Sequence, residues 1–349
     1  MCGICGYVGL EDEQLLSRMI AKLHHRGPDE GGFYRVPGVG LGHRRLSIID
    51  LSRGRQPLSN EDGTLWLTYN GEIYNFAELR AGLEARGHVF KTRSDTEVIL
   101  HAYEEYGIDC LQKFNGMWAF ALWDERERRL IIARDRLGIK PVCYAMVGDA
   151  LLFASEYKAL LECGDIDREV DMQAIAHFAS QRYVGESRTM FKRIHRLPPA
   201  HFLSFKEGRC SLQRYWNLDF DEVEGRTEQD WLDEYVALFD DAVRLRLISD
   251  VPVGAYLSGG LDSTSIVERL ASFGGGRLET FSVGFEGDAD ESVHAADTAR
   301  TLATHHHHHV LDGGDLDLLA SAIWYQEDPV GDAIVVPLYL LSRLAQSRV

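Results

Sequence analysis

Apolar and aromatic residues in the first 162 positions fall into short runs separated by polar turns, a pattern typical of sheet strands. We predict strands at 65–71, 116–124, 128–135 and 150–156. Two further segments, 75–87 and 94–107, place apolar residues at helical spacing between capping signals. These signals are Asn75, Glu78 and Gly87 in the first helix, and Ser94, Glu97 and Gly107 in the second. The pattern predicts an α/β layer domain that is rich in strands.

Residues 163–225 read as a connecting stretch with further strands, because Pro198 and Pro199 forbid a continuing helix between apolar neighbours. The pattern changes after this stretch. A helix over 231–247 precedes an apolar strand at 251–257, a glycine-rich turn, a helix from Ser263 and a strand at 277–285. This order predicts a parallel βαβ unit and a second domain over 226–349.

The run His305–His309 is the one low-complexity tract. Five histidines offer ligands for a transition metal, but a solvated loop is the prediction that we favour.

Composition narrows the class of partner. The chain has 37 basic and 54 acidic residues and a formal charge of −17, which disfavours binding to nucleic acid or anionic membranes. No run approaches the ~20 apolar residues that span a bilayer, and no signal peptide is evident, so we expect a cytoplasmic protein. We expect free thiols at Cys2, Cys5, Cys110, Cys143, Cys163 and Cys210.

Cys2 is the cysteine whose position indicates chemistry. Removal of Met1 would place a thiol and a free α-amino group on one residue, and Gly3 favours that removal. These groups titrate near ~8.5 and ~7.7–8.0, so proton transfer between them is nearly thermoneutral. Cys2 is therefore a candidate nucleophile with its own base. The alternative is a buried structural thiol at the start of a strand.

Five other residues stand at the ends of apolar runs. Arg45 suits a substrate carboxylate, Glu72 and Asp95 suit an ammonium, and Asn70 and Gly71 offer N–H groups to an oxyanion. Together they suit glutamine. Four of them also have a plainer interpretation: a surface ion pair for Arg45, a hairpin turn for Asn70 and Gly71, and a helix-start charge for Asp95.

Nine segments, including MCGICGYVG, HRGPDEGG, LGHRRLSIIDL, YNGEIYN, SDTEVIL and ARDRLGIKP, occur in order from Met1 to about Leu161. They resemble the class II glutamine amidotransferase domain of glutamine-hydrolysing asparagine synthetases. The resemblance implies an N-terminal-nucleophile hydrolase sandwich over 1–162, in which Cys2 attacks glutamine and releases ammonia. It also implies that Arg45, Asn70, Gly71, Glu72 and Asp95 bind glutamine or line the oxyanion hole.

The motif SGGLDS, 258–263, lies between the second domain's first strand and its helix. Gly259 and Gly260 let backbone N–H groups approach an anion, and Ser258 and Ser263 add hydroxyl donors. No Gly-Lys-Ser/Thr follows, so this is not a Walker loop, and Asp262 suits Mg²⁺ better than phosphate. A tight structural turn is the alternative.

In this context the motif resembles the ATP-pyrophosphatase loop of the same synthetases. The resemblance implies a doubly wound parallel sheet, with backbone near Leu257 and Val283 receiving adenine. The family continues beyond the position of Val349 and shows a different sequence at the histidine run, so we expect an incomplete second domain.

The resemblance implies an α/β enzyme that makes asparagine from glutamine, aspartate and ATP with Mg²⁺, through adenylation of aspartate. Two alternatives remain open: amidation of another carboxylate, and a non-catalytic protein that binds glutamine or nucleotide. A homodimer is also left open.

Overall fold

The computed structural model of the chain describes residues 1–185, 187–274, 277–285 and 292–349. They form two compact units, Met1–Asp219 and Phe220–Val349. Both units combine helices with sheets, so the chain is an α/β protein, as predicted.

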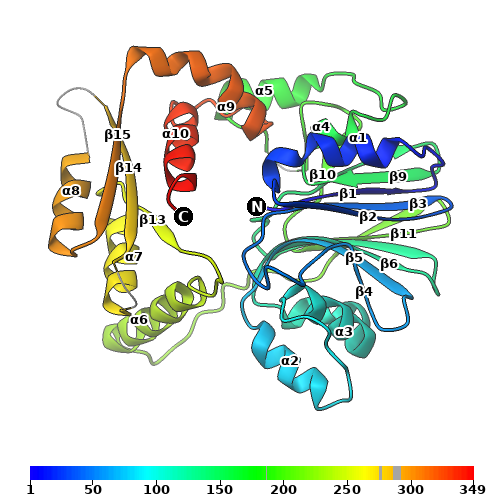
Figure 1. The fold of residues 1–349 in the computed structure, drawn as a ribbon, viewed down its shortest axis with the longest axis horizontal. Coiled ribbons are helices and arrows are strands. Elements are labelled where there is room, and N and C mark those ends of the chain that lie inside the picture. The colour runs from blue at the N-terminus through cyan, green and yellow to red at the C-terminus, as the bar shows by residue number, and fades with distance from the viewer. Residues whose placement is uncertain (186, 275–276, 286–291) are drawn as a thin grey trace. The chain divides into compact units, whose positions relative to one another are not determined.

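Unit 1 is built on two six-stranded antiparallel sheets (Figure 1). The first has the order β10-β8-β9-β1-β3-β2 and the second β12-β11-β7-β6-β5-β4. The first sheet comprises β1 (Gly3–Val8), β2 (Glu30–Val36), β3 (Val39–Arg45), β8 (Cys143–Val147), β9 (Ala150–Ala154) and β10 (Ile194–Arg196). The second comprises β4 (Leu58–Ser59), β5 (Leu65–Ile73), β6 (Gly116–Asp124), β7 (Arg129–Arg134), β11 (His201–Lys206) and β12 (Arg209–Arg214).

Helices cover the outer faces of both sheets. In Figure 1, α1 and α4 lie over the first sheet, and α2 and α3 lie over the second. The unit's helices are α1 (Leu15–Lys22), α2 (Phe76–Glu84), α3 (Thr96–Tyr106), α4 (Tyr157–Leu160) and α5 (Met172–Gln181), with 3-10 turns η1 (His24–Arg26) and η2 (Gly107–Lys113). The predicted sandwich is therefore confirmed as four layers, helix–sheet–sheet–helix.

Strand β6 shows why its sequence is an almost continuous apolar run. Ala119 and Ala121 face the first sheet, in a core shared with Ile4 of β1. Trp118 and Phe120 face the opposite way, in the core that includes α3. Because both faces of the strand are buried, neither set of positions can be polar.

The strands and helices predicted for residues 65–156 are all present, but two caps differ from the prediction. Asn75 is the N-cap of α2, yet its side chain bonds Lys113 and Asn115 and makes no capping hydrogen bond. Helix α3 begins one residue later than predicted, with Asp95 rather than Ser94 as its N-cap.

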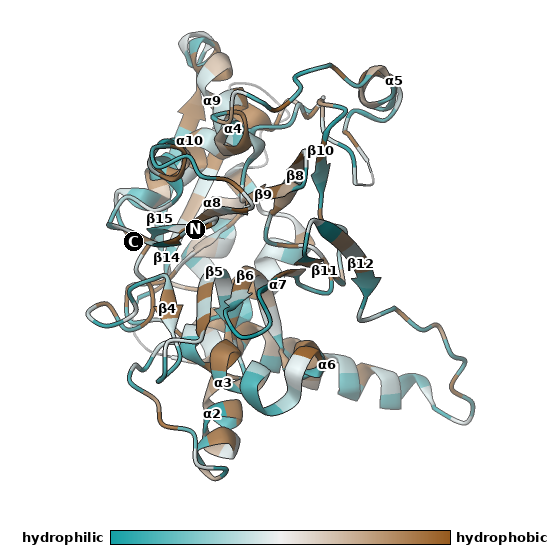
Figure 2. Ribbon diagram, turned by 90° about the vertical axis from the view of Figure 1, so that its right-hand side faces the viewer, coloured by the Kyte–Doolittle hydropathy of each residue, from teal (hydrophilic) through white to brown (hydrophobic). Residues whose placement is uncertain are grey.

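The predicted connecting stretch, 163–225, lies mostly within unit 1. Strands β10 and β11 pair with β8 and β7, so they extend the two sheets. Strand β12 is the outer edge of the second sheet; all of its residues are exposed, and Figure 2 colours it largely hydrophilic.

Unit 2 contains a parallel sheet of three described strands, in the order β13-β14-β15. Its elements are α6 (Glu228–Leu245), β13 (Gly254–Tyr256), α7 (Leu261–Ser272), β14 (Glu279–Phe285), α8 (Ser292–Thr301), β15 (His305–Leu311), η3 (Gly313–Leu318), α9 (Leu319–Gln326) and α10 (Val335–Gln346). The predicted βαβ unit is confirmed as β13-α7-β14. Helices α7 and α8 pack in one core and α9 and α10 in another.

The prediction of a solvated loop at His305–His309 is wrong, because these residues are the first five of β15. Each histidine pairs with a residue of β14, from Glu279 opposite His305 to Val283 opposite His309. Hydrogen bonds along the parallel ladder outweigh the weak strand preference of histidine.

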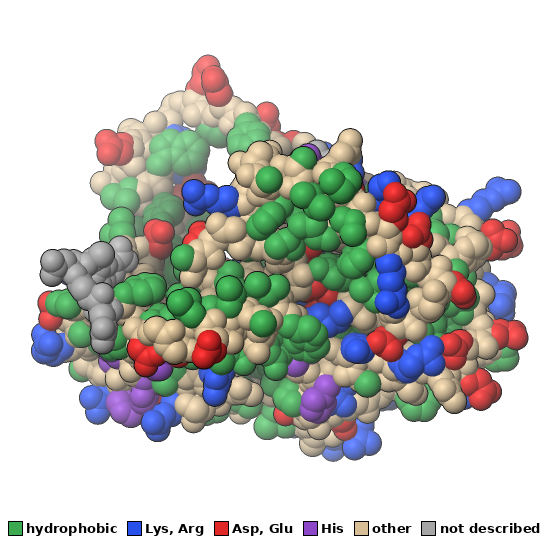
Figure 3. Space-filling view, turned by 90° about the horizontal axis from the view of Figure 1, so that it is seen from above, with side chains coloured by type: hydrophobic (Ala, Val, Ile, Leu, Met, Phe, Trp, Pro, Cys, Tyr) green, Lys and Arg blue, Asp and Glu red, His purple; other side chains and the backbone are tan. Residues whose placement is uncertain are grey.

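Three observations bear on the expectations about membranes, surface charge and free thiols. No helix of the described chain is long and apolar enough to cross a membrane. On the face shown in Figure 3, acidic and basic side chains are interspersed. All six cysteines lie in described residues, and all are free thiols.

Candidate functional site

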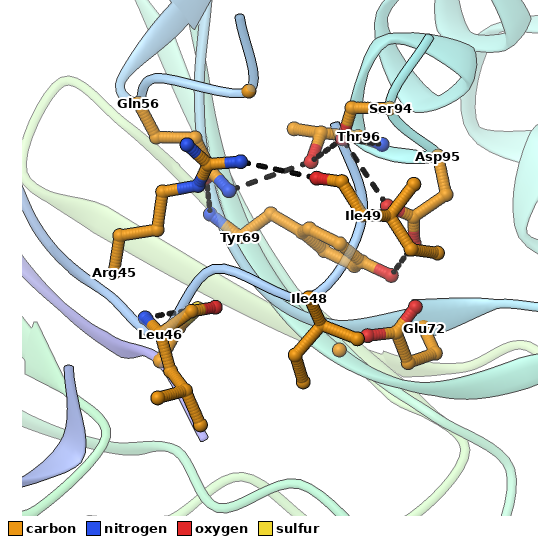
Figure 4. A pocket seen from close by; sticks show the side chains of 13 residues that line it. Arg45, Leu46, Ile48, Ile49, Gln56, Tyr69, Glu72, Ser94, Asp95 and Thr96 are labelled. Atoms are coloured by element: carbon orange, nitrogen blue, oxygen red, sulfur yellow. Dashed lines mark hydrogen bonds between the residues drawn. The ribbon is translucent and has the colours of Figure 1, made fainter. Parts of the chain in front are cut away.

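A pocket lies in unit 1 where β1 begins and where β3 and β5 end (Figure 4). These strands come from both sheets, so the packing of the sandwich assembles the pocket. The pocket is lined by Cys2, Arg45, Leu46, Ile48, Ile49, Gly54, Gln56, Tyr69, Gly71, Glu72, Ser94, Asp95 and Thr96. Five of the six predicted glutamine-site residues are therefore brought together here.

The Cys2 side chain lies at the pocket and is partly exposed, so it is not a fully buried structural thiol. Its Sγ accepts a hydrogen bond from the Leu46 N–H at 3.4 Å. Burial raises the pKa of the thiol, although this hydrogen bond opposes the rise. Burial also lowers the pKa of the Met1 α-amino group to about 6. The environment thus favours a protonated thiol beside an uncharged amine.

Arg45 is 5% exposed, which excludes a surface ion pair. Its guanidinium donates to the backbone oxygens of Ile49 at 3.0 Å and Asp50 at 2.7 Å, and lies 3.6 Å from Glu30 Oε2. A buried cation therefore holds the loop that forms one wall of the pocket.

Glu72 and Asp95 place two acids in the same pocket. Asp95 Oδ2 accepts hydrogen bonds from the Tyr69 hydroxyl at 2.6 Å and the Ile73 N–H at 2.9 Å. These two hydrogen bonds orient the Asp95 carboxylate, which makes no capping hydrogen bond to α3. Burial raises the pKa of Asp95, and burial and the Asp95 charge raise that of Glu72. A cation entering the pocket would relieve both costs.

Asn70 and Gly71 both lie within β5, so their interpretation as a hairpin turn is wrong. Asn70 is 1% exposed, and its Nδ2 has no hydrogen-bond partner among the described residues. Unlike Gly71, Asn70 does not line the pocket. A Cβ on Gly71 would stand 2.4 Å from the Met117 backbone oxygen, so the approach of β6 requires glycine here.

Sequence reasoning missed a buried group of charged residues that contacts the backbone of Cys2. Arg26 Nε donates to the Cys2 carbonyl oxygen at 2.9 Å, and its Nη1 lies 2.6 Å from Glu156 Oε1. His25 and Lys158 also contact this buried carboxylate, each at 3.0 Å. Arg26 belongs to HRGPDEGG, a segment noted in the sequence, but nothing there singles out its contact with Cys2.

Lys140 is a second residue that sequence reasoning missed. It is 6% exposed, and burial lowers its pKa, while the charges of Glu72 and Cys2 act in the opposite direction. It therefore adds positive potential to the surroundings of both pocket residues.

In unit 2, SGGLDS joins β13 to α7, as predicted, although α7 begins at Leu261 rather than Ser263. Gly259 has φ +83°, a conformation that favours glycine. Ser258 Oγ lies 3.0 Å from Ser263 Oγ and accepts from the Gly260 N–H at 3.3 Å. The hydroxyls thus brace the turn, and Gly260 leaves the start of α7 without a side-chain cap.

Leu257 directly follows β13, and Val283 lies in the neighbouring strand β14. The Leu257 N–H donates to the Phe281 oxygen at 2.8 Å, two residues before Val283. The Leu257 side chain packs in the core with Val267. Because its side chain is buried in this core, Leu257 can contact a ligand through its backbone only.

Asp262 is exposed and lies in the first turn of α7. A single exposed carboxylate fits Mg²⁺ that is held mainly by phosphate oxygens and water.

Comparisons with known proteins agree with this division of sites. A glutamine amidotransferase domain family matches residues 1–216, and an asparagine synthase family matches 234–349. "Asparagine synthetase [glutamine-hydrolyzing] 1" of Bacillus subtilis (strain 168) is 38% identical over 361 residues, covering 99% of this chain and 56% of that protein. "Putative asparagine synthetase [glutamine-hydrolyzing] 2" of Methanocaldococcus jannaschii is 34% identical over 375 residues, covering 99% and 72%. The chain belongs to the glutamine-hydrolysing asparagine synthetase family.

Within this family, the chain spans about half the length of the two Bacillus subtilis relatives, 56% and 48%. Among solved structures, a glutamine phosphoribosylpyrophosphate amidotransferase from B. subtilis, complexed with ADP and GMP, is 20% identical with a TM-score of 0.49. That match covers 88% of this chain and 65% of the other chain.

Proposed function

We propose that this chain hydrolyses glutamine at Cys2 and uses the ammonia, with ATP, to convert aspartate into asparagine. The observation that carries the proposal is one pocket holding a thiol, the cation Arg45 and the acids Glu72 and Asp95. A zwitterionic amino acid needs both signs of charge, and a side-chain amide needs a nucleophile. Membership in the family supports the same reaction.

The first step requires removal of Met1, so that the α-amino group belongs to Cys2. The Cys2 thiol proton passes to that amine as Sγ attacks the glutamine side-chain carbonyl carbon. Nδ2 of Asn70 and the N–H of Gly71 stabilise the oxyanion, and the unpaired state of Nδ2 supports this role. The proton then moves to the leaving nitrogen, ammonia departs, and a γ-glutamyl thioester remains.

Hydrolysis completes the first reaction. Water attacks the thioester carbonyl, Sγ leaves, and glutamate is released. Arg45 on the substrate carboxylate and Glu72 with Asp95 on its ammonium keep glutamine in one orientation through both steps.

In unit 2, an aspartate side-chain oxygen attacks the α-phosphate of ATP, and pyrophosphate leaves. Ammonia then attacks the β-aspartyl-AMP carbonyl and AMP leaves. The Ser258–Ser263 turn holds phosphate oxygens at the start of α7, and Leu257 and Val283 offer backbone to adenine. Mg²⁺ bound at Asp262 would neutralise phosphate charge. The reaction would take place in the cytoplasm.

Glutamate release from glutamine, measured for wild type and Cys2→Ala together with N-terminal mass spectrometry, tests the first reaction. Turnover that needs Cys2 and a processed N-terminus supports the proposal. Absence of turnover despite a free Cys2 would favour a non-catalytic binding protein. Replacing aspartate with other carboxylates, with pyrophosphate release as the readout, tests the acceptor.

A further inference from the structure

The histidine run places two imidazoles beside a carboxylate on neighbouring parallel strands of unit 2. Glu279 is the first residue of β14, and its partner in the ladder is His305, the first residue of β15. His307 lies two residues further, on the same face of the sheet as His305. The three side chains therefore converge where both strands begin.

The distances within this cluster are short. His305 Nδ1 lies 2.8 Å from Glu279 Oε1, and His307 Nε2 lies 2.5 Å from Glu279 Oε2. One ligand atom from each residue can be chosen so that all three lie within 4.8 Å of one another. Atoms bonded to one Zn²⁺ at ~2.0–2.1 Å stand roughly 3–4 Å apart, so small side-chain rotations would close the site.

Packing already orients one of the ligands. The His307 ring stacks on Phe281, with centroids 5.2 Å apart and planes at 18°. The His307 side chain is 12% exposed, whereas that of His305 is 50% exposed. One imidazole is thus held in place and the other is open to solvent, which gives an ion a route of entry.

We infer that Glu279, His305 and His307 bind Zn²⁺ or a similar divalent transition-metal ion that joins β14 to β15. Imidazole nitrogen with one carboxylate oxygen is a donor set that suits these ions, while Mg²⁺ and Ca²⁺ prefer oxygen alone. Three protein ligands leave further positions for water. Ligands on rigid strands lose little freedom on binding.

The site is separate from the nucleotide turn. Parallel strands β13 and β14 begin at one edge of the sheet, where Glu279 lies, and the SGGLDS turn follows the opposite end of β13. The ion would therefore stabilise unit 2 by linking two strands and would take no part in the chemistry at ATP.

The same run contains a matched control. His306 and His308 point to the other face, where their rings contact Thr280 and Ser282 at 2.8–3.0 Å. A non-specific affinity of five histidines for metals would depend on both pairs alike. A site on one face would depend on His305 and His307 alone.

The experiment uses the full chain, purified without metal-affinity chromatography and stripped with a chelator. Zn²⁺ affinity is measured by competition with a chromogenic chelator, and Co²⁺ is added as a spectroscopic probe. We compare wild type with Glu279→Gln, the double variant His305→Ala/His307→Ala, and the control His306→Ala/His308→Ala.

We expect one Zn²⁺ per wild-type chain and a visible Co²⁺ absorption typical of low coordination number. Glu279→Gln should weaken Zn²⁺ binding at least ~10-fold and the double variant ~100-fold or more, with the control within a few-fold of wild type. At the same Zn²⁺ concentration, the unfolding temperature of wild type should rise more than that of Glu279→Gln. Equal losses in the control, or no stoichiometric Zn²⁺ in wild type, would overturn the inference. Glu279→Gln is nearly isosteric, so it keeps the test decisive even if the double variant does not fold.

Discussion

The Arg26 guanidinium fixes the backbone of Cys2: its Nε donates to the Cys2 carbonyl oxygen at 2.9 Å, directly beside the proposed nucleophile. Arg26 is itself held by Glu156, at 2.6 Å. The position of Cys2 thus depends on a buried ion cluster that does not line the pocket.

We predict that Arg26→Lys lowers kcat for glutamine hydrolysis by ~100-fold with a smaller change in KM, because Cys2 would lose its orientation while the glutamine contacts remain. Steady-state kinetics test this. Arg18→Ala is the control, since Arg18 forms a partly exposed ion pair with Asp12. A rise in KM alone would show that Arg26 acts on binding instead.

Glu156 should make the free energy of unfolding of unit 1 depend on pH in the acid range. Burial alone would raise its pKa, but the His25 hydrogen bond and the Arg26 and Lys158 charges outweigh burial and lower the pKa to about 2. The carboxylate therefore stabilises the folded state above its ordinary pKa near 4.5, and this stabilisation is lost as pH falls towards 2.

The lost free energy of unfolding should total about 3 kcal/mol, at up to ~1.4 kcal/mol per pH unit. Urea unfolding of wild type and Glu156→Gln between pH 5 and 2 would measure this loss, and the difference in stability between the two proteins should narrow as the pH falls. Glu169→Gln removes an exposed ion pair, so its free energy of unfolding should change with pH as that of wild type does. If the free energy of unfolding of Glu156→Gln changed with pH in the same way as that of wild type does, the link between the lowered pKa of Glu156 and stability would be refuted.

Asn70→Ala should lower kcat for glutamine hydrolysis by ~10²–10³-fold with little effect on KM or stability, because it removes a donor that has no partner in the described structure. Kinetics with thermal unfolding separate the two effects. The contrasting variant is Asn60→Ala, which breaks bonds to Glu104 and Leu65 and should cost stability rather than kcat. Unchanged kcat in Asn70→Ala would remove Asn70 from the oxyanion site.

Gly71→Ala should destabilise unit 1 by about 1–3 kcal/mol, because the new methyl meets the backbone of β6 at 2.4 Å. Denaturant unfolding measures the change. Gly82→Ala is matched to it: Gly82 lies in exposed helix α2, with nothing within 4 Å, and should gain about 0.5–1 kcal/mol. Equal stabilities for both variants would contradict the packing at Gly71.

The raised pKa of Glu72 predicts a pH-dependent KM for glutamine. Protonation of Glu72 removes a charge that would hold the substrate ammonium, so KM should rise as pH falls through this raised pKa, above the ordinary range of a carboxyl group. Glu72→Gln should have a high KM that no longer changes there. A pH-dependent KM that persists in Glu72→Gln would assign the titration to another group, with Asp95 the next candidate.

Local pattern predicted most of the fold, because buried strands such as β6 and helices such as α3 carry their signal within a few residues. Pairing between segments that are distant in the sequence was harder to predict from local pattern. Strand β15 is formed by histidines with weak strand preference, and only its ladder with β14 explains it. The contact of Arg26 with Cys2 joins residues 24 positions apart, through packing that no local pattern encodes.

The site residues were easier to predict than their geometry. Arg45 and Asp95 were named from residue type and from the family resemblance, yet the loop that Arg45 holds and the Tyr69 bond to Asp95 follow from burial. Those contacts required the tertiary structure.

Cys2 directly precedes β1 of the first sheet and Asn70 lies in β5 of the second, and this has a consequence for variation far from the pocket. Small side chains such as Ala119 and Ala121 set how closely the sheets approach, so they also set the distance between thiol and amide. A methyl group added at either alanine would widen the gap between the two sheets. It would move the Cys2 thiol away from the Asn70 amide while leaving every pocket residue unchanged. Tolerance to mutation should therefore be lowest at this inner layer.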